Sequence, residues 1–383
     1  MMKKFVVLAI ALILAVAGLA ACANGNGDDV ADDDITALMD EILAHAVEEY
    51  ADISDIPAYI TIGGEIFSTE LTHLSFNNDR HGSMLNPHPG LTDEDFEPLR
   101  YMTNLDSLFI WGHQISTLAP MAELTNLTQL HLHFMDELHD LTALAELTNL
   151  RILSISGSAF RNNRTPIRDI TPLAELTHLT SLTIDWTTIE DITPLAGLTS
   201  LTSLSLSNNG ITDIEPLAEL TNLESLSLDI NRINDLTPLA GLTNLERLGL
   251  SNNGITDITP LADLTNLESL NLNMNDISSI TPLVRLTNLE SLDLGMNRVR
   301  DITPLADMFY LTRLIMYWNQ IEDITTLARL TNLEELNLNM NQITDITPLT
   351  GLPYLSRMFL SLDSNPIEDM TFYEQLPFLL PSS

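Results

Sequence analysis

The segment LTSLSLSNNGITDIEPLAELTN, residues 201–222, decides the fold because close copies of it follow one another along the chain. From here on the copies open every 22 residues, at Leu201, Leu223, Leu245, Leu267, Leu289, Leu311, Leu333 and Leu355. Towards the N-terminus the opening leucines are less regular, at Leu179, Leu150, Leu127, Leu105 and a degenerate Leu71. Such self-similarity predicts a solenoid of stacked repeats.

Each repeat can be numbered from its opening leucine, which is position 0. Leucines at positions 3 and 5, such as Leu204 and Leu206, point to one side of a short strand, while positions 2, 4 and 6 point to the other. One repeat cannot bury its leucines alone. We therefore expect the repeats to stack into a parallel sheet whose strands lie about 4.8 Å apart.

Two polar signals follow each strand. Asparagine at position 8, such as Asn209, stands where the chain turns, and we expect its side chain to bond backbone groups there. At positions 14 and 15 a Thr-Pro pair, such as Thr259-Pro260, predicts a short helical turn on the outer side, with the threonine as its N-cap.

Aspartate recurs at position 12 of most repeats, at Asp169, Asp191, Asp213, Asp235, Asp257, Asp301, Asp323 and Asp345. We interpret these residues as acceptors for backbone N–H groups in the turn, because a residue present in nearly every repeat serves the fold. Loose binding of divalent cations is the alternative interpretation.

The first residues of the chain have the pattern of an export signal. Lys3 and Lys4 precede an apolar stretch over residues 5–16, and small residues lead to Cys22, the one cysteine of the chain. Residues 19–22, Leu-Ala-Ala-Cys, resemble the lipobox of bacterial lipoproteins, which implies cleavage of a signal peptide (1–21) and lipid attachment at Cys22. An uncleaved transmembrane helix is the alternative.

Two segments separate Cys22 from the repeats. Residues 22–34 are rich in Gly, Asn and Asp and predict a flexible acidic tether. From Asp34 to Tyr50, apolar residues recur with helical spacing, which predicts one amphipathic helix within an N-terminal helical cap over 35–70. The predicted solenoid covers 71–370, and a C-terminal cap or tail covers 371–383.

Charge and cysteine content exclude several classes of protein. Sixteen Lys+Arg against 53 Asp+Glu give a net charge of −37, which opposes binding to nucleic acid or to anionic lipid surfaces through a basic patch. A single cysteine excludes an intrachain disulfide. We find no pattern for catalysis and predict neither an enzyme nor a cofactor.

The repeat pattern LxxLxLxxNxIxDIxPLAxLTN resembles the 22-residue leucine-rich repeat of the internalin family of bacterial surface proteins, over roughly residues 65–370. The resemblance implies an α/β repeat solenoid: a curved rod with parallel strands on its concave face and a helical N-terminal cap. It also implies protein binding on that face. Because we see no immunoglobulin-like pattern or cell-wall sorting signal after the repeats, we do not extend it to host-cell invasion.

Large aromatic residues stand at positions of the open face that elsewhere carry serine or asparagine. The candidate partner-binding residues are Phe109, Trp111, His131, His133 and Trp186, with Phe134 beside them, and then Tyr317, Trp318 and Phe359. Phe359 falls at position 4 if the last repeat keeps its register. Exposed aromatics are typical of binding anchors, and the alternative is packing against neighbouring strands. Whether they form one site or two stays open.

Two further clusters are weaker signals. His131 and His133 alternate on a strand as zinc ligands can, but no third ligand is placed beside them by spacing, so we predict no metal site. The insertion GSAFRNNRTPIRDI gathers Arg161, Arg164 and Arg168 and is either a docking loop for an acidic partner or anionic sugar, or a solvated loop.

Together these patterns predict a lipoprotein displayed on the outside of a bacterial membrane that binds a protein partner through the concave face of the repeats. A glycan or cell-wall polymer is the alternative ligand, because stacked rings above a polar floor suit sugars as well. A purely structural role in the envelope is the third possibility.

Overall fold

The computed structural model describes residues 57–77, 90–157, 164–353 and 359–367. The chain divides into two compact units, Met1–Tyr59 and Ile60–Ser383, and almost all described residues belong to the second. The predicted signal peptide, Cys22, the tether, the helix over 34–50 and the tail over 371–383 lie outside the described residues.

The described part of the predicted N-terminal cap contains strands. β1 (Tyr59–Ile62) and β2 (Glu65–Ser68) form a two-stranded sheet. Gly63 and Gly64 join them with φ of 58° and 84°, a left-handed turn that glycine makes at low cost. A connection this short joins antiparallel neighbours. The helical cap therefore does not continue over residues 59–68.

The repeats form one parallel sheet in which 13 strands follow each other in sequence order, from β3 to β15. Its strands are β3 (His73–Asn77), β4 (Ser107–Trp111), β5 (Gln129–His133), β6 (Ile152–Ser156), β7 (Ser181–Asp185), β8 (Ser203–Ser205), β9 (Ser225–Ser227), β10 (Arg247–Gly249), β11 (Ser269–Asn271), β12 (Ser291–Asp293), β13 (Arg313–Ile315), β14 (Glu335–Asn337) and β15 (Phe359–Ser361). Equivalent residues pair across them, as Leu204 with Leu226 and Leu226 with Leu248. The predicted leucine-rich repeat solenoid is confirmed.

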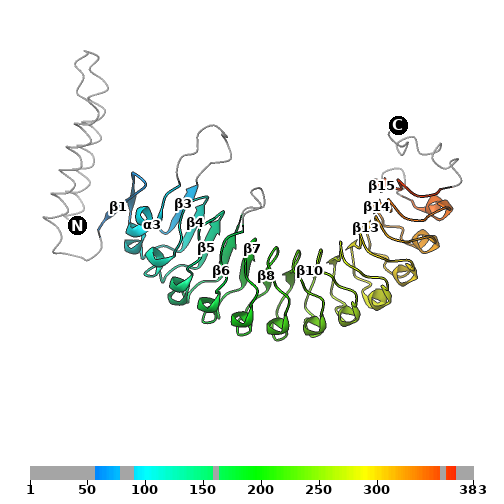
Figure 1. Ribbon diagram of the computed structural model, residues 1–383, viewed down its shortest axis with the longest axis horizontal. Helices are drawn as coiled ribbons and strands as arrows, with labels where there is room; N and C mark the ends of the chain where they lie inside the picture. Colours follow the sequence, from blue (N-terminus) through cyan, green and yellow to red (C-terminus); the bar gives the residue numbers. More distant parts are fainter. Residues whose placement is uncertain (1–56, 78–89, 158–163, 354–358, 368–383) are drawn as a thin grey trace, which may run out of the picture. The chain divides into compact units, whose positions relative to one another are not determined.

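Short helices return the chain from one strand to the next. They are α3 (Asp93–Phe96) and the 3₁₀ helices η1 (Glu97–Tyr101), η2 (Ala119–Met121), η3 (Thr142–Glu146), η5 (Thr171–Leu173), η6 (Thr193–Leu195), η7 (Glu215–Leu217), η8 (Thr237–Leu239), η9 (Thr259–Leu261), η10 (Thr281–Arg285), η11 (Thr303–Leu305), η12 (Thr325–Arg329) and η13 (Thr347–Gly351). Figure 1 shows the strands of the repeats along the inner side of an arc and the helices along its outer side. The strands thus line a concave face.

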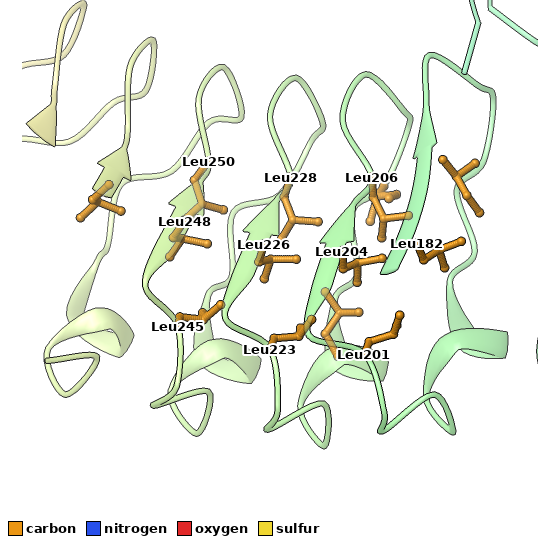
Figure 2. Packing of buried hydrophobic residues seen from close by; sticks show 14 of the residues in the cluster. Leu182, Leu201, Leu204, Leu206, Leu223, Leu226, Leu228, Leu245, Leu248 and Leu250 are labelled. Carbon is orange, nitrogen blue, oxygen red and sulfur yellow. The ribbon is translucent and has the colours of Figure 1, made fainter. Parts of the chain in front are cut away.

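The core of the repeats is built from columns of leucine. Leu245, Leu248 and Leu250 are at most 2% exposed, and Figure 2 shows each of them aligned with the equivalent leucines of the preceding repeats. The predicted inward direction of positions 3 and 5 is confirmed. Truncating one such leucine to alanine typically costs about 2–5 kcal/mol.

Asparagines at position 8 form a ladder through the repeats. Asn231 is buried, and its Nδ2 donates to the carbonyls of Leu206 and Leu228 at 2.9 and 3.0 Å. Its Oδ1 accepts from the N–H of Ile211 at 3.1 Å. Because each amide satisfies backbone groups that the turn leaves unpaired, the sequence-based interpretation of position 8 is confirmed.

The position-12 aspartates cap the 3₁₀ helices. Oδ1 of Asp257 accepts from the N–H of Thr259 at 2.8 Å, and the other seven aspartates of the column make the same bond at 2.8–2.9 Å. Their predicted role as backbone acceptors is confirmed. The prediction that Thr259 is the N-cap was wrong: Thr259 is the first residue of η9, and the carboxylate two residues earlier supplies the capping oxygen.

Candidate interaction surface on the concave face

Five rings on β4, on β5 and directly after β5 form one continuous cluster, which we call the aromatic patch: Phe109, Trp111, His131, His133 and Phe134. Strand register places Phe109 beside His131 and Trp111 beside His133. Ring centroids lie 6.1 Å apart for Phe109 and Trp111, 5.6 Å for Phe109 and His133, and 4.6 Å for Trp111 and Phe134. All five side chains are half-buried. The two strands thus bring together the N-terminal candidates, except Trp186.

The two histidines are held in their neutral form near neutral pH. Burial lowers the pKa of His131, and burial together with the nearby His131 lowers the pKa of His133. Their rings stack with centroids 6.2 Å apart. Nδ1 of His133 and the Ser156 hydroxyl on β6 are in hydrogen-bond contact at 2.6 Å, which orients that imidazole. Protonation would place two like charges side by side among apolar rings.

Trp186 follows β7, two strands away from β5 in the sheet. Two strand spacings separate it from the patch by about 10 Å. Its side chain is half-buried and its backbone is left-handed, with φ of 57°. It stands apart from the aromatic patch as a separate residue at the edge of the concave face.

Tyr317 lies flat on the strand next to its own. A Cβ atom added at Gly295 would collide with the tyrosine ring, so the ring occupies the space that this glycine leaves. Across one more strand, Nδ2 of Asn273 contacts the Tyr317 hydroxyl at 3.1 Å. Tyr317 is half-buried as a result. The outward position of Tyr317 suggested a side chain that is free to bind a partner. These contacts instead favour the alternative interpretation, in which the ring packs against neighbouring strands.

Trp318 behaves differently from its neighbour in the chain. Its side chain is 57% exposed, and its backbone has φ of 55°. It stands at position 7, the same position as Met296 in the preceding repeat and Met340 in the following one.

The register assumed for Phe359 was wrong. Phe359 pairs with Glu335, which is position 2 of its repeat, rather than position 4. The two-residue expansion of the last repeat comes before β15, so the strand begins two residues late. Phe359 is 80% exposed, but it opens β15, whereas Trp318 lies in the turn after β13, on the far side of β14 in the sheet. Tyr317, Trp318 and Phe359 therefore do not form one cluster.

Sequence reasoning missed the backbone conformation of position 7. In the repeats from Leu179 onward this residue has φ between 51° and 59°, whatever its side chain: Trp186, Asn208, Ile230, Asn252, Met274, Met296, Trp318 and Met340. Few residues other than glycine and asparagine adopt this region readily. Asn208 and Asn252 were the available signal, because asparagine is the non-glycine residue that tolerates it best.

The opposite edge of the sheet is acidic. A shallow groove of about 610 Å³ crosses neighbouring repeats there, and its lining includes a row of glutamates at position 1: Glu224, Glu246, Glu268 and Glu290. Equivalent residues on neighbouring strands lie about 4.8 Å apart. Asparagines before the opening leucines complete this lining, each with Nδ2 donating to a backbone carbonyl of the preceding repeat, as Asn244 does to Thr221 at 2.9 Å.

The arginine-rich insertion is described only in part, since Arg161 lies outside the described residues. Nη1 of Arg164 donates to the carbonyl of Asn209 at 3.3 Å, and Arg168 is exposed. Among the described residues, no group of three or more His, Cys, Asp or Glu side chains is arranged to hold a metal ion. Within the same residues, no helix has the length and apolar character needed to cross a membrane.

Comparison with family models matches leucine-rich repeats, described as "Leucine Rich repeats (2 copies)", at residues 199–241, 243–283, 265–307 and 311–354. Comparison with curated proteins finds no match.

Several solved structures share the fold. An internalin (inlF) from Listeria monocytogenes is 31% identical over 88% of this chain and 93% of its own length, with a TM-score of 0.73. The functional domain of InlJ from Listeria monocytogenes, which includes a cysteine ladder, is 22% identical over 82% of this chain and 68% of its own, with a TM-score of 0.59. The plant peptide hormone receptor RGFR1 in complex with RGF2 is 18% identical over 70% of this chain and 49% of its own, with a TM-score of 0.54. The last two likenesses show the fold alone.

Proposed function

Because this chain belongs to the internalin family of leucine-rich repeat proteins, we propose that it recognises a protein partner through the concave face of its repeats. The aromatic patch is the centre of that surface. The role is one of binding rather than catalysis. A protein of this kind works by shape and by a few large side chains that the partner covers.

The observation that carries this proposal is the mutual contact of the five rings in the aromatic patch. Each ring is half-buried against its neighbours, so it has already lost most of its rotational freedom before a partner arrives. Rings fixed in this way contribute contact area at a low entropic cost. Energetic hot spots in protein interfaces are rich in tryptophan and tend to lie in well-packed clusters.

A glycan is the second candidate ligand. Phe109 and Trp111 stack with an interplanar angle of 27°, which offers a nearly flat apolar platform. The hydroxyls of Ser154 and Ser156 lie on β6, on the other side of β5, where they contact the His133 ring and can also meet a sugar hydroxyl. Sugars present an apolar ring face and a polar rim to such a surface. A purely structural role in the envelope requires neither the platform nor the hydroxyls.

We further propose that the chain is a lipoprotein anchored through acyl chains on Cys22 to the outer side of a bacterial membrane. The proposal rests on the export signal and on the position of the single cysteine. Radiolabelled palmitate should be incorporated into the wild type and not into Cys22→Ala. Equal labelling of both would contradict the anchor.

Binding is tested with purified full chain against panels of purified proteins and of glycans. The test variant is Phe109→Ser/Trp111→Ser, because serine stands at positions 4 and 6 of sister repeats, at Ser205 and Ser207, and fits the strand. The control is Tyr310→Asn, which removes a 63% exposed ring from the opposite edge, where sister repeats carry asparagine.

We expect a partner bound by the wild type and by Tyr310→Asn to lose at least about tenfold in affinity with the serine variant. Loss of a protein ligand supports the first candidate and loss of a glycan supports the second. Ligands that bind the serine variant as tightly as the wild type would contradict the patch as the binding centre.

A further inference from the structure

Four consecutive repeats carry a large apolar residue at position 7: Met274, Met296, Trp318 and Met340. We call this row the methionine rim. Met274 is 43% exposed, Trp318 57% and Met340 50%, whereas Met296 is half-buried. The rim ends at polar residues on both sides, Asn252 in the preceding repeat and Ser364 after the last. An exposed apolar row of this length marks an interaction surface in soluble proteins.

The fold does not require apolar residues at these positions. All four have φ between 54° and 56°, a left-handed conformation that asparagine adopts at lower cost than methionine or tryptophan. Asn208 and Asn252 occupy the same position in sister repeats with φ of 59° and 51°. The chain thus holds exposed apolar side chains where a polar residue would fit the backbone better. Such strained positions gather at binding sites.

We propose that the methionine rim binds an amphipathic α-helix that carries a basic polar face. This surface goes beyond the proposed function, because it shares no residue with the aromatic patch and lies on other repeats. The spacing of the rim and the net charge of its repeats point to this partner.

The spacing of the rim matches the pitch of a helix. Neighbouring strands lie about 4.8 Å apart, so the rim spans about 14 Å over three intervals. One turn of α-helix rises about 5.4 Å, so about three turns lie along the rim with one apolar side chain per repeat. The mismatch accumulates to about 2 Å, which unbranched methionine side chains can absorb. Helix binding in an apolar groove uses this i, i+4, i+7 pattern.

The net charge of the repeats that carry the rim favours a basic partner. Residues 267–354 contain five arginines and 11 acidic residues, a net charge of 5 − 11 = −6. Four of the arginines are paired with carboxylates: Arg285 with Asp263, Arg298 with Asp276, Arg313 with Glu335 and Arg329 with Asp307. The remaining one, Arg300, bonds Gln320 at 2.8 Å. The net negative charge of these repeats attracts a helix whose outer face carries lysine and arginine.

The same charge argues against the chain's own predicted helix, from a second copy, as the occupant. Residues 34–50 contain five acidic residues and no lysine or arginine. Like charges on the helix and on the repeats would oppose docking.

The probe for the test is a fluorescent peptide of about 16 residues, with leucine at i, i+4, i+7 and i+11 and lysine on the remaining faces. Two control peptides have the same length. One contains the same residues with the leucines at i, i+2, i+4 and i+6, so that they do not share one face of a helix. The other replaces lysine by glutamate. Fluorescence anisotropy measures binding to the purified full chain, and circular dichroism measures helix formation in the bound peptide.

The protein variant is M274N/M296N/W318N/M340N, which gives the rim the residue that sister repeats carry. Trp318→Asn alone serves as a milder variant, and Tyr310→Asn is the matched control for loss of an exposed ring elsewhere. Because asparagine suits the backbone at position 7, both rim variants should keep the wild-type midpoint of thermal unfolding or exceed it.

We expect the helical basic peptide to bind the wild type and Tyr310→Asn and to become helical. The quadruple variant and both control peptides should each weaken binding by at least about tenfold.

Equal binding by the quadruple variant would overturn the proposal, and so would equal binding of the alternating or acidic peptide. A lower unfolding midpoint in Trp318→Asn would assign the rim to packing. A dimer that only the quadruple variant abolishes, seen by sedimentation, would assign it to a second copy. None of these results bears on the aromatic patch.

Discussion

The repeats before Leu201 and those after it differ at position 8, beneath the concave face. After Leu201 this position is asparagine in every described repeat, from Asn209 to Asn341. Before it, the position holds His113, Met135 and Thr187. His113 supplies an acceptor through Nδ1, which takes the N–H of Leu91 at 3.0 Å, whereas Met135 has no comparable group.

The two candidate surfaces follow this division. The aromatic patch belongs to the irregular repeats, and four of its five residues stand on β4 and β5, whereas Phe134 follows β5 with a left-handed φ of 58°. The methionine rim belongs to the regular repeats. Its residues stand in a left-handed turn, which methionine and tryptophan adopt at a higher energetic cost than asparagine. The left-handed turn itself is common to both regions, because Phe134 and Trp186 have φ of 58° and 57° although Met135 and Thr187 occupy position 8 of their repeats.

The largest effect should come from breaking the ladder. In Asn319→Ala, the carbonyls of Leu294 and Met316 and the N–H of Val299 lose partners at 2.8, 3.1 and 2.9 Å. We expect a loss of about 3 kcal/mol in the free energy of unfolding, because buried backbone groups are left unpaired. Urea denaturation measures it.

Thr187→Ala is the matched change in the irregular repeats, because it removes a hydroxyl that donates to Asn209 Oδ1 at 2.6 Å. We expect about 1 kcal/mol there. Equal losses in Asn319→Ala and Thr187→Ala would show that the ladder does not distinguish the two regions.

A smaller effect should follow from filling the space beneath Tyr317. In Gly295→Ala the new methyl group collides with the tyrosine ring, so we expect a loss of about 1–2 kcal/mol. Adding Tyr317→Ser, which gives position 6 the serine of sister repeats, should restore most of it. A double-mutant cycle measures the coupling. Additive effects would contradict the packing of Tyr317 on Gly295.

The two surfaces should also differ in their response to pH. The pKa values of His131 and His133 are lowered in the folded state, so folding disfavours their protonated forms. Stability is therefore complete above the unfolded pKa of about 6.5 and declines as pH falls below it. The unfolding midpoint should fall less between pH 7 and about pH 5 in His131→Ser/His133→Ser than in the wild type.

Binding at the aromatic patch should weaken over the same range, whereas the methionine rim contains no group that titrates there. Identical pH profiles for the variant and the wild type would contradict this difference.

The smallest effect should appear in acid, in the caps of the 3₁₀ helices. Hydrogen bonds from the threonine two residues on lower the pKa of Asp169, Asp191, Asp235, Asp257, Asp301 and Asp323. Their contribution to stability is present above the unfolded pKa of about 3.9 and is lost as pH falls through the lower folded values.

Replacing Asp191 and Asp257 by serine, the residue that Ser279 supplies at this position, should make the unfolding midpoint less sensitive to acid below about pH 4. Asp185 is a useful contrast, since burial raises its pKa. An unchanged acid profile in the serine variant would contradict the role of the caps.

Much of the fold was predictable because a strict period and strand parity leave few alternatives. The inward leucines, the asparagine ladder and the position-12 acceptors all follow from position in a 22-residue repeat, and the structure confirms each. The aromatic patch was predictable for the same reason, since residues at positions 4 and 6 of neighbouring strands must meet. Its role in binding stays a prediction.

Other features depended on contacts that no single repeat contains. The Tyr317 ring lies flat because Gly295, 22 residues earlier, leaves room for it and Asn273, 44 residues earlier, contacts its hydroxyl. Phe359 stands at position 2 rather than position 4 because the two extra residues of the last repeat precede the strand. The methionine rim forms one row because position 7 takes the same left-handed backbone conformation in each of its four repeats. Local pattern therefore determines which side of the strand a residue takes, whereas neighbours across the stack decide whether its side chain stands free.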